Sequence, residues 1–125
     1  MLDANFILRF LLRDIEEQFR EAKNIVRNEH CFVTLEILAE VSYVLEGVYQ
    51  VSRVDIIRNF RELSKVVLIQ NADVLLRALE IFDKLPKLDF VDCLLYGYKM
   101  ERGMEIKTFD RKLKKKLEEV EILGW

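Results

Sequence analysis

Apolar residues along the chain follow two kinds of spacing, one helical and one strand-like. Stretches in which apolar residues recur every three or four positions predict amphipathic helices. These helices are expected at about 4–12, 16–28, 35–46, 53–63, 72–84, 90–100 and 111–117. Brief apolar runs that are rich in β-branched residues predict buried strands. These strands are expected at 1–2, 31–33, 66–69, 104–109 and 120–123.

Several polar residues and glycines stand where helices are expected to begin or end. Thr34 is an expected N-cap, and Asp55 follows Ser52 at the spacing of a capping box. Gly47 and Gly103 stand just past the expected ends of two helices, as glycine commonly does. Because strand and helix alternate throughout, the pattern predicts an α/β fold, a three-layer sandwich in which helices flank a mainly parallel sheet. No linker or repeat interrupts the pattern, so residues 1–125 are expected to form a single domain.

The composition of the chain excludes several classes of protein. Its 125 residues are 51% hydrophobic and 34% charged, which is the balance of one soluble globular domain. The formal net charge of −2 gives no global basic field, so a polyanion would need a local basic patch or a bound metal. Charged residues interrupt the longest apolar runs and occur early in the chain. This argues against a membrane span and a signal peptide, and it predicts a cytoplasmic protein.

The single histidine and the two cysteines limit the kinds of catalytic and metal site that the chain can form. His30 is the only histidine, which leaves little basis for a histidine-rich zinc site or a Ser-His-Asp triad. It is expected on a surface loop before a strand. Cys31 and Cys93 stand alone in two apolar segments and are expected to be small, buried thiols in a reducing compartment.

Four carboxylates stand at the boundaries of apolar segments: Asp3, Glu40, Asp92 and Asp110. Asp92 is the only charge in the run 90–98, and an unpaired carboxylate in such a place carries a large desolvation cost. Because ligands of parallel α/β sheets gather at the carboxyl ends of the strands, all four are expected to meet at one edge. Oxygen ligands of this kind suit Mg²⁺ or Mn²⁺. The pattern therefore predicts metal-dependent hydrolysis, and a phosphodiester substrate requires no histidine.

Each of these acids also has a purely structural interpretation. Asp3 and Asp110 could each cap the helix that follows. Asp89 and Asp92 could together form an N-terminal cap pair, which is the favoured interpretation for Asp89 but not for Asp92.

The choice of Glu40 over Glu36 rests on helical geometry. At about 100° per residue, Glu40 borders the apolar stripe of its helix whereas Glu36 points outward.

Polar and basic neighbours complete the candidate site. Asn5 and Thr108 stand next to two of the acids and are suited to hydrogen-bond a ligand or a metal-bound water; ordinary turn and strand roles are the alternative. The basic stretch 111–116 is usually a solvated helix face, but with Arg9 and Arg13 it could hold a phosphate backbone.

Four segments together resemble the signature motifs of PIN-domain ribonucleases. The opening segment 1–14 looks like the family's first motif, with Asp3 and Asn5 in place. Segments 37–45, 88–95 and 107–113 resemble the second, third and fourth acidic motifs, in the same order and at similar spacing. Four motifs in register are more specific than any one of them. The chain resembles in particular the small VapC-type toxins of prokaryotic toxin–antitoxin pairs.

The resemblance implies a fold, an activity and partners. It implies a parallel five-stranded sheet of order 3-2-1-4-5, dependence on Mg²⁺ or Mn²⁺ and endonucleolytic cleavage of RNA. It also implies homodimers and inhibition by a small antitoxin protein. Carried over to this chain, Asp3, Glu40, Asp92 and Asp110 would be the metal ligands, with Asn5 and Thr108 supporting them.

Two departures from the family pattern bear on activity. Only Met1 and Leu2 precede Asp3, where the family has several apolar residues, so the first strand is expected to be clipped or the chain to start upstream. Ala4 replaces the usual threonine and removes one hydroxyl. The alternative to an active nuclease is therefore a catalytically impaired member of the same fold that binds RNA or protein. A second alternative is a phospho-acceptor receiver domain, which is also an α/β fold with carboxylates at strand ends. It would need a lysine at the end of the last strand, and residues 120–124 contain none, which argues against it.

Overall fold

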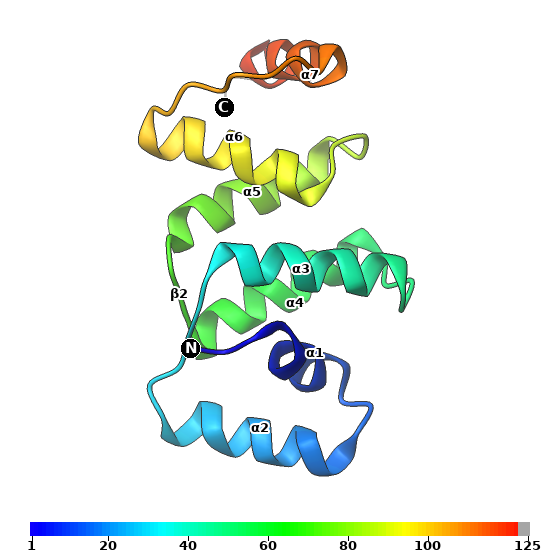
Figure 1. Ribbon diagram of the computed structural model, residues 1–125, viewed down its shortest axis with the longest axis vertical. Helices are drawn as coiled ribbons and strands as arrows, with labels where there is room; N and C mark the ends of the chain where they lie inside the picture. Colours follow the sequence, from blue (N-terminus) through cyan, green and yellow to red (C-terminus); the bar gives the residue numbers. More distant parts are fainter. Residues whose placement is uncertain (123–125) are drawn as a thin grey trace. The chain divides into compact units, whose positions relative to one another are not determined.

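The structure of the protein is a computed structural model that describes residues 1–122 (Figure 1). The chain divides into two compact units, of which the first is Met1–Ala72 and the second begins at Asp73. The first unit contains α1 (Ala4–Leu12), α2 (Glu16–Asn28), β1 (Phe32–Val33), α3 (Leu35–Gly47), α4 (Arg53–Val66) and β2 (Leu68–Ile69). The remaining helices are α5 (Ala72–Lys84), α6 (Phe90–Arg102) and α7 (Arg111–Ile122). The prediction of a single domain over residues 1–125 stays a prediction.

Local capping explains where most of these helices begin. The Thr34 hydroxyl accepts a hydrogen bond of 3.4 Å from the Ile37 N–H, and the Ser52 hydroxyl accepts one of 3.2 Å from the Asp55 N–H. Both predicted N-caps are therefore confirmed, because these side chains satisfy N–H groups that have no partner inside the helix. Gly103 ends α6 with a φ of 66°, a left-handed conformation that favours glycine.

The prediction of a five-stranded α/β sandwich is wrong. The structure is 71% helical, and the sheet formed within residues 1–122 has two short parallel strands. Phe32 pairs with Leu68 and Val33 pairs with Ile69. The Leu68 N–H donates a hydrogen bond of 3.0 Å to the Cys31 carbonyl. Two-residue strands give too few ladder bonds to build a layer, so helices supply most of the packing.

The expected first strand, residues 1–2, is represented by one backbone hydrogen bond. The Leu2 N–H donates to the Phe32 carbonyl at 2.9 Å. Successive carbonyls along a strand point to opposite sides, so this bond lies on the edge of β1 that faces away from β2. The extended residues before Asp3 therefore run beside β1, and this contact fixes where α1 begins.

The expected fourth and fifth strands do not form in the described part of the chain. Residues 104–109 have no regular secondary structure, and the Phe109 side chain is fully exposed. Val120 belongs to α7 because Leu113, Leu117 and Val120 follow the i, i+4, i+7 spacing of a helix rather than the alternation of a strand. Leu123, the last residue of that expected strand, lies outside the described residues.

Each unit packs around its own apolar residues. In the first unit α1 packs against both α2 and α3, with Ile7 fully buried. In the second unit α6 lies between α5 and α7 (Figure 1). A Cβ at Gly97 of α6 would lie 2.7 Å from the Val74 carbonyl oxygen of α5, so the two helices approach closely there. Phe82 and Phe90 pack edge to face at 5.7 Å between ring centroids.

Cys93 is buried and Cys31 is partly buried, and neither forms a disulfide within the described residues. His30 is exposed in the segment before β1, as predicted. Within residues 1–122, every helix is too short or too polar to cross a membrane.

Candidate functional site

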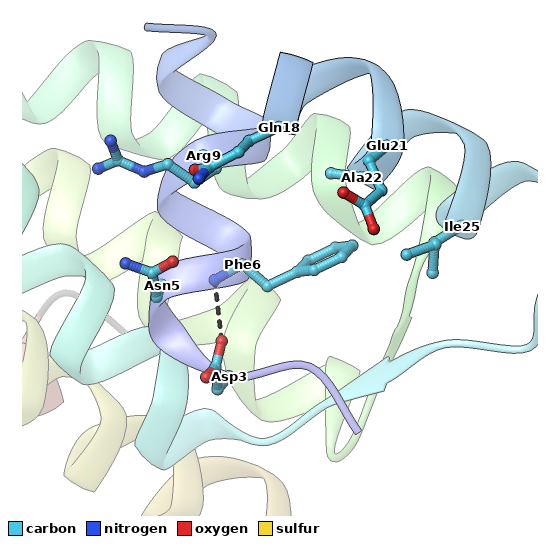
Figure 2. A pocket seen from close by; sticks show the side chains of 8 residues that line it. All are labelled: Asp3, Asn5, Phe6, Arg9, Gln18, Glu21, Ala22 and Ile25. Atoms are coloured by element: carbon cyan, nitrogen blue, oxygen red, sulfur yellow. Dashed lines mark hydrogen bonds between the residues drawn. The ribbon is translucent and has the colours of Figure 1, made fainter. Parts of the chain in front are cut away.

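A cavity of about 290 Å³ lies between α1 and α2 in the first unit. Figure 2 shows the residues that line it: Asp3, Asn5, Phe6, Arg9, Gln18, Glu21, Ala22 and Ile25. The Asp3 carboxylate accepts a hydrogen bond of 2.9 Å from the Phe6 N–H, so it caps α1. The capping interpretation of Asp3 is therefore confirmed, and it leaves the second oxygen of that carboxylate available to a ligand.

The two candidate arginines, Arg9 and Arg13, are engaged by neighbouring side chains. The Arg9 guanidinium donates to the Asp14 carboxylate at 2.7 Å and to the Tyr49 hydroxyl at 3.1 Å. These contacts raise the pKa of Arg9 above its ordinary value, the Tyr49 hydrogen bond most of all. The Arg13 guanidinium lies 4.8 Å from the centroid of the Phe19 ring, which is the distance of a cation–π contact. Contact of either arginine with RNA stays a prediction.

Glu40 lies on α3 and its side chain is exposed. Glu36, one turn earlier on the same helix, is exposed as well. The angular difference between the two carboxylates therefore does not translate into a difference in burial. The role of Glu40 as a metal ligand stays a prediction.

A second cavity, of about 450 Å³, lies between α6 and α7 in the second unit. The residues that line it are Lys87, Leu88, Asp92, Asp110, Lys112, Leu113, Lys115 and Lys116. The structure thus brings two of the candidate carboxylates, Asp92 and Asp110, to one cavity, although 17 residues lie between them in the sequence. Four lysines surround this pair.

Asp92 is half-buried in the first turn of α6. Burial raises the pKa of Asp92 above its ordinary value, and the negative charges of Asp89 and Asp110 raise it further. The ion pairs found within residues 1–122 include neither Asp92 nor Asp110. Asp92 is therefore a carboxylate whose charged form is disfavoured in the protein alone, and a bound cation would offset that penalty.

Asp110 is held in place from both sides. Its Oδ1 atom accepts hydrogen bonds from the Lys112 N–H at 2.9 Å and the Leu113 N–H at 3.3 Å, so it caps α7. The Asp110 N–H donates to the Thr108 hydroxyl at 2.9 Å. Thr108 therefore supports the backbone that carries Asp110, and the capping interpretation of Asp110 is confirmed.

Tyr96 and Lys87 are residues of this cavity region that sequence reasoning missed. The buried Tyr96 hydroxyl donates to the Leu113 carbonyl at 3.1 Å, which ties α6 to the first turns of α7. Its position four residues after Asp92, on the same helix face, was a signal that could have found it. Lys87 lies in the connection between α5 and α6 and gave no such signal.

The carboxylates of the second cavity suit a hard divalent cation. Mg²⁺ is commonly held by one or two protein carboxylates together with water and substrate phosphate, so Asp92 and Asp110 are the residues of this cavity that would hold it. In the part of the chain that the structure describes, no group of three or more Asp, Glu, His or Cys side chains is arranged to hold a metal. Asp3 and Glu40 lie in the first unit and Asp92 and Asp110 in the second, so a single pocket of four carboxylates stays a prediction.

Comparison with known protein families gives a match over nearly the whole chain. The model of the PIN domain family matches residues 1–118. The chain belongs to the PIN domain family. PIN domains are typically nucleases, which generally use divalent metal ions and bind nucleic acid substrates. Searches of curated proteins and of solved structures gave no match. The PIN match includes all four candidate carboxylates and both cavities.

Proposed function

We propose that this PIN-domain chain is an endoribonuclease that depends on Mg²⁺ or Mn²⁺ and hydrolyses RNA phosphodiester bonds. Its catalytic and metal-binding carboxylates are Asp3, Glu40, Asp92 and Asp110. The observation that carries the proposal is the cavity in which Asp92 and Asp110 lie among lysines within a member of a nuclease family. We further propose that the chain is the toxin of a type II toxin–antitoxin module, acting as a cytoplasmic homodimer that a small antitoxin inhibits.

The chemistry divides between the metal and the protein. A divalent ion held by the carboxylates would generate a nucleophilic water and neutralise charge on the phosphate. Asp92 must give up its proton before it can bind a cation, and its raised pKa places that step at a higher pH than for an ordinary aspartate. The N–H groups of Lys112 and Leu113 hold the Oδ1 atom of Asp110, and neither of these bonds involves its Oδ2 atom.

A catalytically impaired PIN domain that only binds RNA or protein is the second candidate function. In the part of the chain that the structure describes, Asp92 and Asp110 share a cavity as a pair, and no group of three or more Asp, Glu, His or Cys side chains is arranged to hold a metal, which favours this candidate. The two candidates differ in turnover, because the impaired protein would bind RNA without cleaving it.

The decisive experiment replaces Asp92 with asparagine, which keeps the shape of the side chain and removes its charge. With Mn²⁺ present, Asp92→Asn is expected to lower the rate of RNA cleavage by at least about 100-fold, as loss of one key electrostatic group commonly does. Asp83→Asn is the matched control, since Asp83 is exposed at the end of α5. Circular dichroism checks that both variants remain folded.

Three results are possible. Loss of cleavage in Asp92→Asn alone supports the proposal. Unchanged cleavage in that variant removes Asp92 from the mechanism. Wild-type protein that binds RNA but does not cleave it with Mn²⁺ supports the impaired candidate instead.

A further inference from the structure

The lysines around the Asp92–Asp110 cavity differ in how far their charges are already engaged. Lys116 lies 3.3 Å from both oxygens of Glu119 and is mostly buried, with its side chain 20% exposed. Lys87, Lys112 and Lys115 are exposed, and the ion pairs placed within residues 1–122 include none of the three. Three of the four positive charges at this cavity are therefore available to a ligand.

These three lysines come from two separate walls of the cavity. Lys87 lies in the connection that precedes α6, whereas Lys112 and Lys115 lie one turn apart on the same face of α7. Lys114 stands between them in sequence, but at about 100° per residue it points to the opposite side of the helix. It is not one of the residues that line the cavity. The basic stretch 111–116 thus has one face directed to the carboxylates and one directed away from them.

The charge balance of the cavity suits an anion that arrives beside a metal. Lys87, Lys112 and Lys115 contribute +3, and Asp92 and Asp110 contribute −2 when both are ionised. The carboxylates alone would repel a phosphodiester, and the lysines offset that repulsion. Lysine also binds phosphate as a point charge without base preference, so its contribution is expected to be independent of sequence.

We infer that Lys87, Lys112 and Lys115 bind the phosphate backbone of the RNA at the Asp92–Asp110 cavity, whereas Lys114 and the Glu119-paired Lys116 do not. This inference rests on the proposed function, because it concerns the substrate of that same site. Within the basic stretch 111–116, the inference distinguishes Lys112 and Lys115 from Lys114 and Lys116. It also adds Lys87, which lies outside that stretch.

The test measures binding of a short fluorescein-labelled single-stranded RNA by anisotropy, in EDTA and over a series of salt concentrations. One phosphate contact to a single strand contributes about 0.7 to the slope of log affinity against log salt, which is about fivefold in affinity at about 0.1 M salt. Lys87→Gln, Lys112→Gln and Lys115→Gln are each expected to lose about that much of the affinity and of the slope. Lys114→Gln is the matched control on the same helix and is expected to leave both unchanged.

The outcomes distinguish this inference from the nuclease proposal. Cavity-lysine variants that bind like wild type, or a Lys114→Gln variant that weakens binding as much as they do, would overturn the inference even if the enzyme cleaves RNA. Because the assay contains no metal, a wild-type protein without cleavage activity would contradict only the nuclease proposal. A polyglutamate peptide that binds more tightly than RNA, with the same dependence on the three lysines, would overturn the inference in favour of an acidic protein partner.

Discussion

The cavity of the first unit and the cavity of the second both contain acidic and basic side chains, but these charged groups have different partners. Between α1 and α2, the arginine that lines the cavity is engaged by Asp14 and Tyr49, and Asp3 is exposed. Between α6 and α7, Asp92 is half-buried next to two other carboxylates, and three lysines stand without an ion pair among the described residues. The basic side chain of the first cavity is therefore already paired, whereas three of the basic side chains of the second are not.

This difference shows where binding energy is available. A charged group that is already paired gains little from a ligand, since the new contact replaces an existing one. A carboxylate kept from ionising by burial and by like charges gains a great deal from a cation. The second cavity is therefore the better starting point for experiments on metal and phosphate, and the two units can be perturbed separately to test that view.

The largest expected effect comes from Gly97 of α6, in the second unit. In Gly97→Ala the new Cβ would lie 2.7 Å from the Val74 carbonyl oxygen, so α5 and α6 must move apart. We expect a loss of about 2–3 kcal/mol in the free energy of unfolding, as overpacking commonly causes. Urea denaturation measures this loss. The variant should also bind Mn²⁺ more weakly, because a displaced α6 moves Asp92.

Gly47→Ala in the first unit is the matched control for this variant. A Cβ there has no atom within 4 Å, and the residue lies in the last turn of α3. Alanine is expected to be neutral or to stabilise by up to about 1 kcal/mol. Equal destabilisation by the two substitutions would contradict the close approach of α5 and α6.

A smaller effect is expected when the hydroxyl of Tyr96 is removed. Tyr96→Phe keeps the buried ring and deletes the hydrogen bond to the Leu113 carbonyl, so the loss of stability should be about 1 kcal/mol. Mn²⁺ affinity, measured by calorimetry, should also fall, since this bond holds the first turns of α7 next to α6. Tyr98→Phe on the same helix is the control. Equal effects of the two variants on metal affinity would show that Tyr96 has no special role in positioning.

Local signals in the sequence predicted the helices well. Ser52 and Thr34 cap their helices through hydrogen bonds to residues three positions later, so the sequence contains the whole interaction. A strand forms only when it pairs with a segment that is distant in the chain, and the sequence does not show which segments pair. The prediction of five strands was therefore wrong. Val66 reads as part of a β-branched run, yet it is the last residue of α4, and only Leu68 and Ile69 pair with β1.

The candidate site was predictable to a similar degree. The cost of an unpaired carboxylate in an apolar run singled out Asp92, and the structure gives it half-buried, with Asp89 and Asp110 nearby. Helical angle did not distinguish Glu40 from Glu36, because tertiary packing decides which side of a stripe is covered. Lys87 could not be found at all, since its place at the cavity depends on how the connection after Pro86 folds.

The smallest predicted effect is a shift in the pH dependence of metal binding when Asp89 is made neutral. The Asp89 carboxylate caps α6 by accepting a 2.8 Å hydrogen bond from the Asp92 N–H, and its charge helps to raise the pKa of Asp92. Asparagine caps a helix about as well as aspartate, so Asp89→Asn should keep the fold and lower the pKa of Asp92. Because a cation binds the ionised carboxylate, Mn²⁺ binding is lost as the pH falls through that pKa. In the variant, calorimetry should therefore find that binding persists to lower pH than in the wild type.

The stability of the metal-free protein gives an independent check. The contribution of Asp92 to stability is lost as the pH rises, whereas metal binding is lost as the pH falls. A carboxylate whose pKa is raised on folding stabilises the fold below its unfolded pKa, and this contribution is lost as the pH rises through the folded pKa. Asp89→Asn should reduce that loss, so its melting temperature should fall less than that of the wild type between acidic and neutral pH. Asp83→Asn, which removes an exposed charge from α5, should follow the wild type in both measurements. If Asp83→Asn shifts both curves as much as Asp89→Asn does, net charge rather than the Asp89–Asp92 contact sets the pH dependence.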